Sequence, residues 1–247
     1  RPLFILFALL LAASLLGLAA VLRQHAVQTF GTVNGLPDAA LDPRPAGLAI
    51  NVALEQYSDL NPVLDSLAPF NWLRQIFPWD EIEPKPGEFH WDKWDAIVAR
   101  TVSRQKSIIA VLNFSPAWAR NQGAGAQPDA PTARAGPPVS PDDFASFASA
   151  FAARYADSID VYQIWDEPNL LAGWGGQQPS AAEYAALLQK AYVAIHAADP
   201  TATVIAAALA PTVETGPDNI SDLIYLQQLY DLGAGRYFDA AAGKPYG

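Results

Sequence analysis

The sequence predicts an α/β domain built on a parallel sheet, and three observations lead to that fold class. From Gly47 onward, short apolar runs alternate with segments of helical periodicity. Several of the runs are apolar throughout, as strands covered on both faces are. The helical segments begin with capping residues, which marks them as separate elements between strands. This alternation is the sequence sign of βαβ units, in which the strands run parallel.

Strands are expected at six places along the chain. In order, the runs are Leu48–Leu54, Trp72–Phe77, Ser107–Phe114, Asp160–Trp165, Thr203–Leu209 and Phe238–Ala242. Each is short and apolar, and polar or aromatic residues cluster where several of them end. Since parallel strands end at the same edge of a sheet, we expect those side chains to gather there.

Four helices are expected between or after these strands. Ser140 followed by Pro141 gives a cap and a first-turn proline. Ser180 followed by Glu183 three residues later is a capping-box pattern. The expected helices are Trp94–Arg104, Asp143–Tyr155, Ala181–Ala198 and Ser221–Leu232.

Six strands in this order fit the first six units of a (β/α)8 TIM barrel. A complete barrel usually takes about 250 residues, and Gly247 comes just past the sixth strand, so we expect an incomplete barrel. An open doubly wound sheet is the structural alternative. That fold normally carries a glycine-rich phosphate turn after its first strand, whereas Glu55–Ser58 follows here.

The N-terminal segment is the most apolar part of the chain. Leu3–Leu22 contains no charged residue, and a helix of that length spans about 30 Å, the thickness of a bilayer core. We therefore expect residues 1–23 to be a transmembrane anchor, 24–46 a linker and 47–247 the folded domain. A cleaved signal segment and a buried soluble helix are the alternatives. Anchor and signal alike place the domain outside the cytoplasm.

Composition narrows the class of partner. The chain has 25 Asp and Glu against 15 Lys and Arg and a net charge of −10, which argues against a nucleic-acid partner. It has no cysteine, so disulfides and thiolate metal sites are excluded. Its histidines, His25, His90 and His196, lack the spacing of metal ligands. We expect no metal and no organic cofactor, and the oligomeric state is left open.

The segment Ile164–Asn169 carries the chemistry that we consider most informative. It places Trp165, Asp166 and Glu167 where a strand ends, so an acid stands at the rim of the sheet beside an aromatic ring. Burial and a neighbouring carboxylate would both favour a protonated Glu167, as a general acid requires. The alternative is a carboxylate that caps the next helix before Pro168.

Four segments together resemble the retaining glycoside hydrolases of the large Trp-Asn-Glu-Pro clan, in its β-xylosidase-like and cellulase-like families. They are Trp72–Trp79, Ile82–Trp91, Ser115–Ala119 and Ile164–Asn169, and they occur in the order of that clan. The resemblance covers residues 48–247. It implies a TIM barrel that hydrolyses O-glycosidic bonds in β-linked oligo- or polysaccharides by double displacement.

By this resemblance, Glu167 matches the general acid/base and Arg74 the arginine of the second strand, which supports the nucleophile. A structural salt bridge is the alternative role for Arg74. Tyr246 matches a tyrosine of the sixth strand, with rim packing as its alternative. Two positions depart from the clan: Asp166 replaces an asparagine that binds the sugar, and Lys244 replaces a histidine. Both departures bear on substrate preference.

Three tryptophans are candidate platforms for sugar rings, with core or rim packing as the alternative for each. They are Trp79, Trp118 and Trp174. Retaining hydrolysis also needs a nucleophilic carboxylate, which the clan places after the seventh strand. Glu214 is an unconvincing substitute, so we expect the polypeptide as given to be inactive by itself. A noncatalytic carbohydrate-binding barrel at the cell surface and a purely structural domain are the remaining hypotheses.

Overall fold

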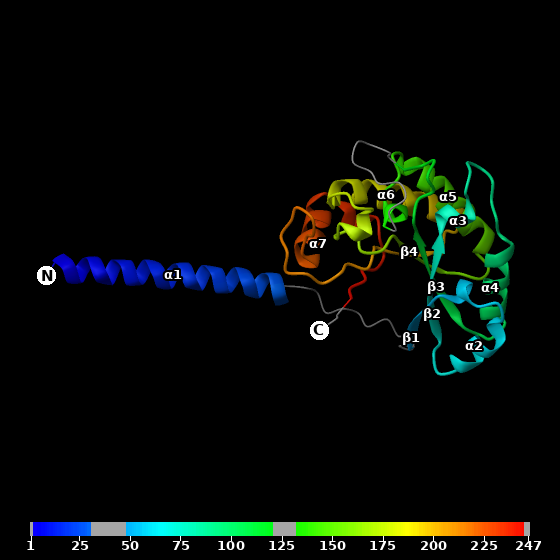
Figure 1. The fold of residues 1–247 in the computed structure, drawn as a ribbon, viewed down its shortest axis with the longest axis horizontal. Coiled ribbons are helices and arrows are strands. Elements are labelled where there is room, and N and C mark those ends of the chain that lie inside the picture. The colour runs from blue at the N-terminus through cyan, green and yellow to red at the C-terminus, as the bar shows by residue number, and fades with distance from the viewer. Residues whose placement is uncertain (1, 31–47, 121–131, 245–247) are drawn as a thin grey trace. The chain divides into compact units, whose positions relative to one another are not determined.

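The computed structural model describes residues 2–30, 48–120 and 132–244 of the chain. It divides into two units, Arg1–Pro43 and Arg44–Gly247. In the first unit, helix α1 runs over Pro2–Phe30 (Figure 1). The helix passes the expected end of the anchor at residue 23, so the first part of the expected linker is helical. The remainder of that linker lies outside the described residues.

The expected membrane anchor over Leu3–Leu22 is not supported. A helix must be both long and apolar enough to cross a bilayer. Among the described residues, no helix fulfils both conditions.

The second unit is built on one parallel sheet whose strands lie side by side in chain order (Figure 1). The strands are β1 Ala49–Val52, β2 Trp72–Pro78, β3 Ser107–Asn113, β4 Val161–Ile164 and β5 Thr203–Ile205. The α/β class and five of the six expected strands are therefore confirmed. The sixth, Phe238–Ala242, forms no strand. Ala240 in this segment forms a single parallel bridge with Ile205 of β5, and Gly243 just after the segment forms another with Leu209, too few to make a ladder.

Helices lie on the outside of this sheet (Figure 1). They are α2 Leu60–Ser66, α3 Trp79–Ile82, α4 Asp92–Val102, α5 Pro141–Tyr155, α6 Ala181–Ala198 and α7 Asp222–Asp231, with single 3-10 turns at η1 Leu54–Gln56, η2 Ala133–Ala135, η3 Ala172–Trp174 and η4 Ala234–Arg236. All four expected helices are present. The expected cap of α6 is confirmed, because the Ser180 hydroxyl accepts a hydrogen bond from the Glu183 amide at 3.2 Å.

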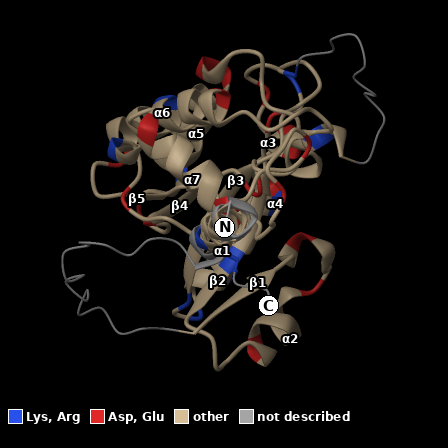
Figure 2. Cartoon of the chain, turned by 90° about the vertical axis from the view of Figure 1, so that its left-hand side faces the viewer, with Lys and Arg blue, Asp and Glu red and all other residues tan. Residues whose placement is uncertain are grey.

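Strand β2 shows how the sheet separates its two faces. Leu73, Gln75 and Phe77 are buried toward the helices, whereas Arg74 and Ile76, which alternate with them, are only partly buried. The face that would be the interior of a closed barrel therefore stays open to solvent and carries a charged residue. Figure 2 shows acidic and basic residues interspersed around helices α3 to α6 on the side that it presents.

Candidate active site at the end of strand β4

The chain leaves β4 in an unusual backbone conformation. Trp165 has φ 68° and Glu167 has φ 51°, so both adopt the left-handed conformation that side chains other than glycine seldom take. Two hydrogen bonds fix this segment: the Trp165 amide donates to Leu112 O at 2.9 Å, and the Glu167 amide donates to Ala208 O at 3.0 Å. Such strain persists only where surrounding contacts enforce it, and it is common at functional sites.

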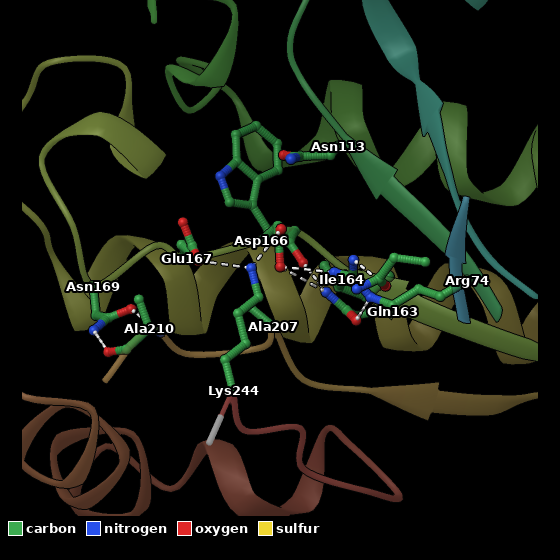
Figure 3. Close-up of polar contacts among 12 residues, drawn as sticks. Arg74, Asn113, Gln163, Ile164, Asp166, Glu167, Asn169, Ala207, Ala210 and Lys244 are labelled. Carbon is green, nitrogen blue, oxygen red and sulfur yellow. Dashed lines mark hydrogen bonds and ion pairs between the residues drawn. The ribbon is translucent and has the colours of Figure 1, made fainter. Parts of the chain in front are cut away.

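Lys244 lies between the two carboxylates that follow β4 (Figure 3). Its Nζ is 2.7 Å from Glu167 Oε1 and 3.0 Å from Asp166 Oδ2. The Lys244 side chain is 14% exposed, Asp166 17% and Glu167 33%, so Glu167 is the most accessible of the three. One ammonium group thus offsets the repulsion between neighbouring carboxylates. The sequence did not predict that Lys244 would bind both of them.

Arg74 supplies the second cation of this cluster from the middle of β2. Its Nη2 donates to Asp166 Oδ1 at 2.7 Å, its Nε to Gln163 Oε1 at 2.9 Å and its Nη1 to Asn51 Oδ1 at 3.3 Å. The guanidinium therefore joins residues of β1, β2 and β4 across the inner face of the sheet. Asp166 is held by both cations and has little freedom to move.

A cavity of about 280 Å³ lies against this inner face. Asn51, Arg74, Gln163 and Lys244 give it a polar wall, and Ile109 is among its apolar lining residues. Asp166 and Glu167 are not part of the lining. Lys244 belongs to the lining and contacts both carboxylates, so it connects this cavity to Glu167.

Asn169 and Tyr184 join β4 and the residues after it to the segment that follows β5. The Asn169 amide group donates to Ala210 O at 2.8 Å, and Asn169 Oδ1 accepts from the Ala210 amide at 3.0 Å (Figure 3). The Tyr184 hydroxyl donates to Ile164 O at 2.9 Å and accepts from the Ala207 amide at 2.6 Å. Burial raises the pKa of Tyr184, so its hydroxyl remains a neutral donor.

The rim beside β2 and β3 has an ion pair of its own. Arg134 binds both oxygens of Asp80, at 2.7 and 3.0 Å, and stacks over the ring of Phe114 at 4.2 Å. Burial raises the pKa of Asp80 although Arg134 opposes that change. Phe114, with φ 66°, is a third left-handed residue at a strand end.

Two of the three candidate sugar platforms lie inside the protein, and the third is partly exposed. Trp79 and Trp174 are fully buried, and their ring nitrogens donate to Glu83 Oε2 at 2.7 Å and to Glu183 Oε2 at 3.3 Å. Trp118 is partly buried and packs edge-on against Trp79, at 5.5 Å between ring centroids. Packing, the alternative stated for all three, accounts for these positions.

Of the two remaining candidates, only Glu214 lies within the described residues, and it is not joined to the carboxylates and cations around Glu167. Tyr246 lies outside the described residues. Glu214 is exposed in the loop after β5, where Oε1 accepts from Asn219 Nδ2 at 3.0 Å. Within the described ranges, no group of three or more His, Asp or Glu side chains could hold a metal ion.

Sequence reasoning missed most of the residues that support the site. Asn51 and Gln163 carry polar side chains inside apolar strands, and that interruption was the available signal. Tyr184 and Gly173 gave no signal, because a buried tyrosine and a loop glycine are common in any helix or turn. Only the fold shows that they contact the end of β4.

No family model matches the chain, and no curated protein matches its sequence. Solved structures do. A family 39 glycoside hydrolase from Bacteroides cellulosilyticus WH2 aligns with a TM-score of 0.60 and 17% identity, covering 80% of this chain and 38% of that one. A monomeric β-xylosidase from Caulobacter crescentus CB15 aligns with a TM-score of 0.60 and 18% identity, covering 81% and 42%. A family 39 enzyme from Xanthomonas axonopodis pv. citri aligns with a TM-score of 0.59 and 17% identity, covering 81% and 41%.

This chain spans less than half the length of each of these three proteins. At such identity the likeness concerns the fold, and it agrees with the resemblance that the four sequence segments indicated. Since five parallel strands in chain order with outer helices are the first part of a TIM barrel, the chain has the fold of part of a TIM barrel, the fold that it shares with these three proteins.

Proposed function

We propose that the protein hydrolyses O-glycosidic bonds in β-linked oligo- or polysaccharides, with Glu167 as the general acid/base of a retaining double displacement. The observation that carries this proposal is the position of Glu167. It stands at the carboxyl end of a parallel strand, in a left-handed conformation and partly exposed. Catalytic residues of this fold occupy that end of the strands.

The geometry gives each group near Glu167 a chemical task. Lys244 holds Oε1, and within the described residues no donor contacts Oε2, which leaves that oxygen to carry the proton. Asp166 is bound by both Arg74 and Lys244, so it accepts hydrogen bonds and does not donate one. We assign it to binding a sugar hydroxyl. The nucleophile is a second carboxylate about 5–5.5 Å from Glu167.

A noncatalytic carbohydrate-binding barrel is the second candidate. The observation that favours it is the contact of Lys244 with both carboxylates, since a charged, paired Glu167 is a hydrogen-bond acceptor rather than an acid. The two functions differ in turnover. Both would bind glycans, and only the first would cleave them.

Aryl β-glycosides assayed with the full-length protein test the proposal. Glu167→Gln keeps the shape of the side chain but removes its acid function, so kcat/KM should fall by about 10²- to 10⁴-fold on substrates whose aryl group needs a proton to leave, such as 4-methoxyphenyl. Glu214→Gln, which alters an exposed carboxylate outside the cluster, is the matched control and should keep full activity. Equal rates for wild type and Glu167→Gln would exclude Glu167 from the mechanism. Glycan binding without any turnover would favour the second candidate.

We also propose that the domain acts outside the cytoplasm. The apolar run Leu3–Leu22 supports this, because such N-terminal segments are typical of exported chains. Protease added to intact cells should digest the domain. Full protection until the cells are lysed would contradict export.

A further inference from the structure

Gly173, in the turn η3, lies against the backbone of Glu167. A Cβ atom added to Gly173 would lie 2.0 Å from Glu167 O, 2.8 Å from its carbonyl carbon and 3.1 Å from its Cβ. These atoms belong to the main chain of Glu167 and the root of its side chain, so no flexible group could move aside. Glycine is therefore required here for close approach of two backbones.

The turn that contains Gly173 is tied to the residues it contacts. The indole nitrogen of Trp165 donates to Gly173 O at 3.0 Å, and the Leu170 amide donates to Glu167 O at 3.1 Å. The turn is also anchored in the core, because the buried ring of Trp174 lies 5.7 Å from the ring of Trp165. The segment after Glu167 thus folds back and rests on its peptide group.

This contact matters because the conformation of Glu167 is strained. A left-handed residue with a side chain costs about 1–2 kcal/mol relative to the right-handed form. The hydrogen bond from Leu170 holds the Glu167 carbonyl, and that carbonyl occupies the space that a side chain at position 173 would need. We propose that Gly173 is a positioning residue that fixes the direction of the Glu167 side chain. Its catalytic consequence rests on the proposed function.

The chemistry of the acid step supplies a specific measurement. When the C1–O bond breaks, its electron pair goes to the leaving oxygen, the nucleophilic carboxylate bonds to C1, and Glu167 transfers its proton to that oxygen. A 2,4-dinitrophenyl group leaves as a stable anion without needing the proton, whereas a 4-methoxyphenyl group needs it. A misplaced acid therefore slows the second substrate more than the first.

The test compares Gly173→Ala with wild type in the full-length protein on both aryl β-glycosides. We expect kcat/KM for the methoxyphenyl substrate to fall about 100-fold, as a displacement of about 1 Å would cause. The dinitrophenyl substrate should lose less than about 10-fold, because its departure needs little acid assistance. An equal loss on both substrates, or no loss on either, would overturn the positioning role.

Glu167→Gln, measured alongside, separates this inference from the function it rests on. If Glu167→Gln shows the leaving-group dependence and Gly173→Ala does not, only the positioning role fails. If Glu167→Gln behaves as wild type, the proposed function itself fails.

Two further variants guard against a simple folding defect. Gly235→Ala is the matched control, since its Cβ would meet the ring of Tyr230 at 2.8 Å, but that side chain is 53% exposed and free to yield. It should show wild-type activity on both substrates. If Gly173→Ala does not fold, Trp165→Phe removes the hydrogen bond to Gly173 O and keeps a smaller aromatic ring in its place. Trp165→Phe should slow the methoxyphenyl substrate more than the dinitrophenyl substrate, by a smaller factor than Gly173→Ala. Equal effects on the two substrates would overturn the proposal.

Discussion

Two regions of the second unit, Arg44–Gly247, differ in how well local backbone and charge preferences agree with the fold. The first is the aromatic layer between the sheet and helices α4 and α5, formed by Phe77, Trp91, Trp94, Phe151 and Tyr155. Its rings pack at centroid distances such as 4.9 Å for Phe77 with Phe151 and 4.7 Å for Phe151 with Tyr155. None of these five residues has a positive φ. In this layer, apolar side chains are packed together on backbone of ordinary conformation, as local preferences favour.

The second region is the rim at the carboxyl ends of β3 and β4. Phe114, Trp165 and Glu167 are left-handed, and Arg74 and Lys244 bring partly buried charges onto the same face. Each of these features costs stability by itself. Proteins often keep such conflicts where function requires them, so the features of this rim agree with the position of the candidate site.

The largest effect on the free energy of unfolding should come from a substitution in the aromatic layer. Phe151 is fully buried and contacts four other rings of the core besides Phe77. Phe151→Ala should lower the free energy of unfolding by about 3–5 kcal/mol, because it removes apolar contacts and leaves a cavity. Urea denaturation measures this value. Val213→Ala, at a side chain that is 74% exposed, should change it by less than about 0.5 kcal/mol.

A small loss in Phe151→Ala would contradict the view that this layer carries much of the stability. It would mean that neighbouring rings collapse into the space, as happens at adaptable core sites.

Local sequence patterns agree with the fold in the aromatic layer, and for that reason the strands and helices that form it could be predicted from the sequence. Continuous apolar runs placed β2, β3 and β4 within one or two residues of their observed bounds, and capping patterns placed α5 and α6. The misses have physical causes. Helix α3 has one turn and α2 two, too short for a periodic pattern, and Phe238–Ala242 has an apolar run without the pairing that makes a strand.

The site could be predicted only in part. A carboxylate after an apolar strand pointed to Glu167, because strand ends are set by short-range patterns. The contacts of Lys244 with Asp166 and Glu167 join residues 78 and 77 positions apart, and no local pattern encodes them. Tryptophans are ambiguous for another reason: an aromatic ring suits a sugar face and a core equally well, and only burial distinguishes the two.

A smaller effect sharpens the comparison at the rim. Replacing Glu167 by glycine or by alanine removes the same carboxylate, but only glycine accepts φ 51° without strain. Glu167→Gly should therefore be more stable than Glu167→Ala by about 1 kcal/mol. Thermal unfolding of the two variants measures the difference.

The same pair of substitutions should act in the opposite direction within a helix. Val193 lies in α6 and is 58% exposed, so Val193→Gly should be less stable than Val193→Ala by about 1 kcal/mol. If alanine were the better residue at both positions, the left-handed backbone of Glu167 would not be a source of strain.

The smallest effect concerns an ion pair that joins α4 to α5 at the edge of the aromatic layer. Arg154 donates to both oxygens of Asp95, and the Tyr155 hydroxyl donates to Oδ1 at 2.9 Å. The hydrogen bond from Arg154 is the main cause that holds the pKa of Asp95 below its usual value, against the opposing effect of burial. The charged form is therefore favoured by folding. Its contribution is complete above the unfolded-state pKa and is lost as the pH falls through the lower folded-state pKa.

Asp95→Asn should accordingly lower the free energy of unfolding at pH 7 by less than about 1 kcal/mol, because exposed ion pairs are screened by solvent. The gap between wild type and variant should close as the pH is lowered below about 4, where the unfolded carboxyl begins to bind protons. Urea titrations at a series of pH values measure it, with Asp157→Asn, an exposed carboxylate on the following turn, as control. A gap that stayed constant at every pH would show that packing of the polar group, rather than its charge, links these helices. The layer would then owe its stability to contact alone, and the rim would be the only region of this comparison in which charge decides the structure.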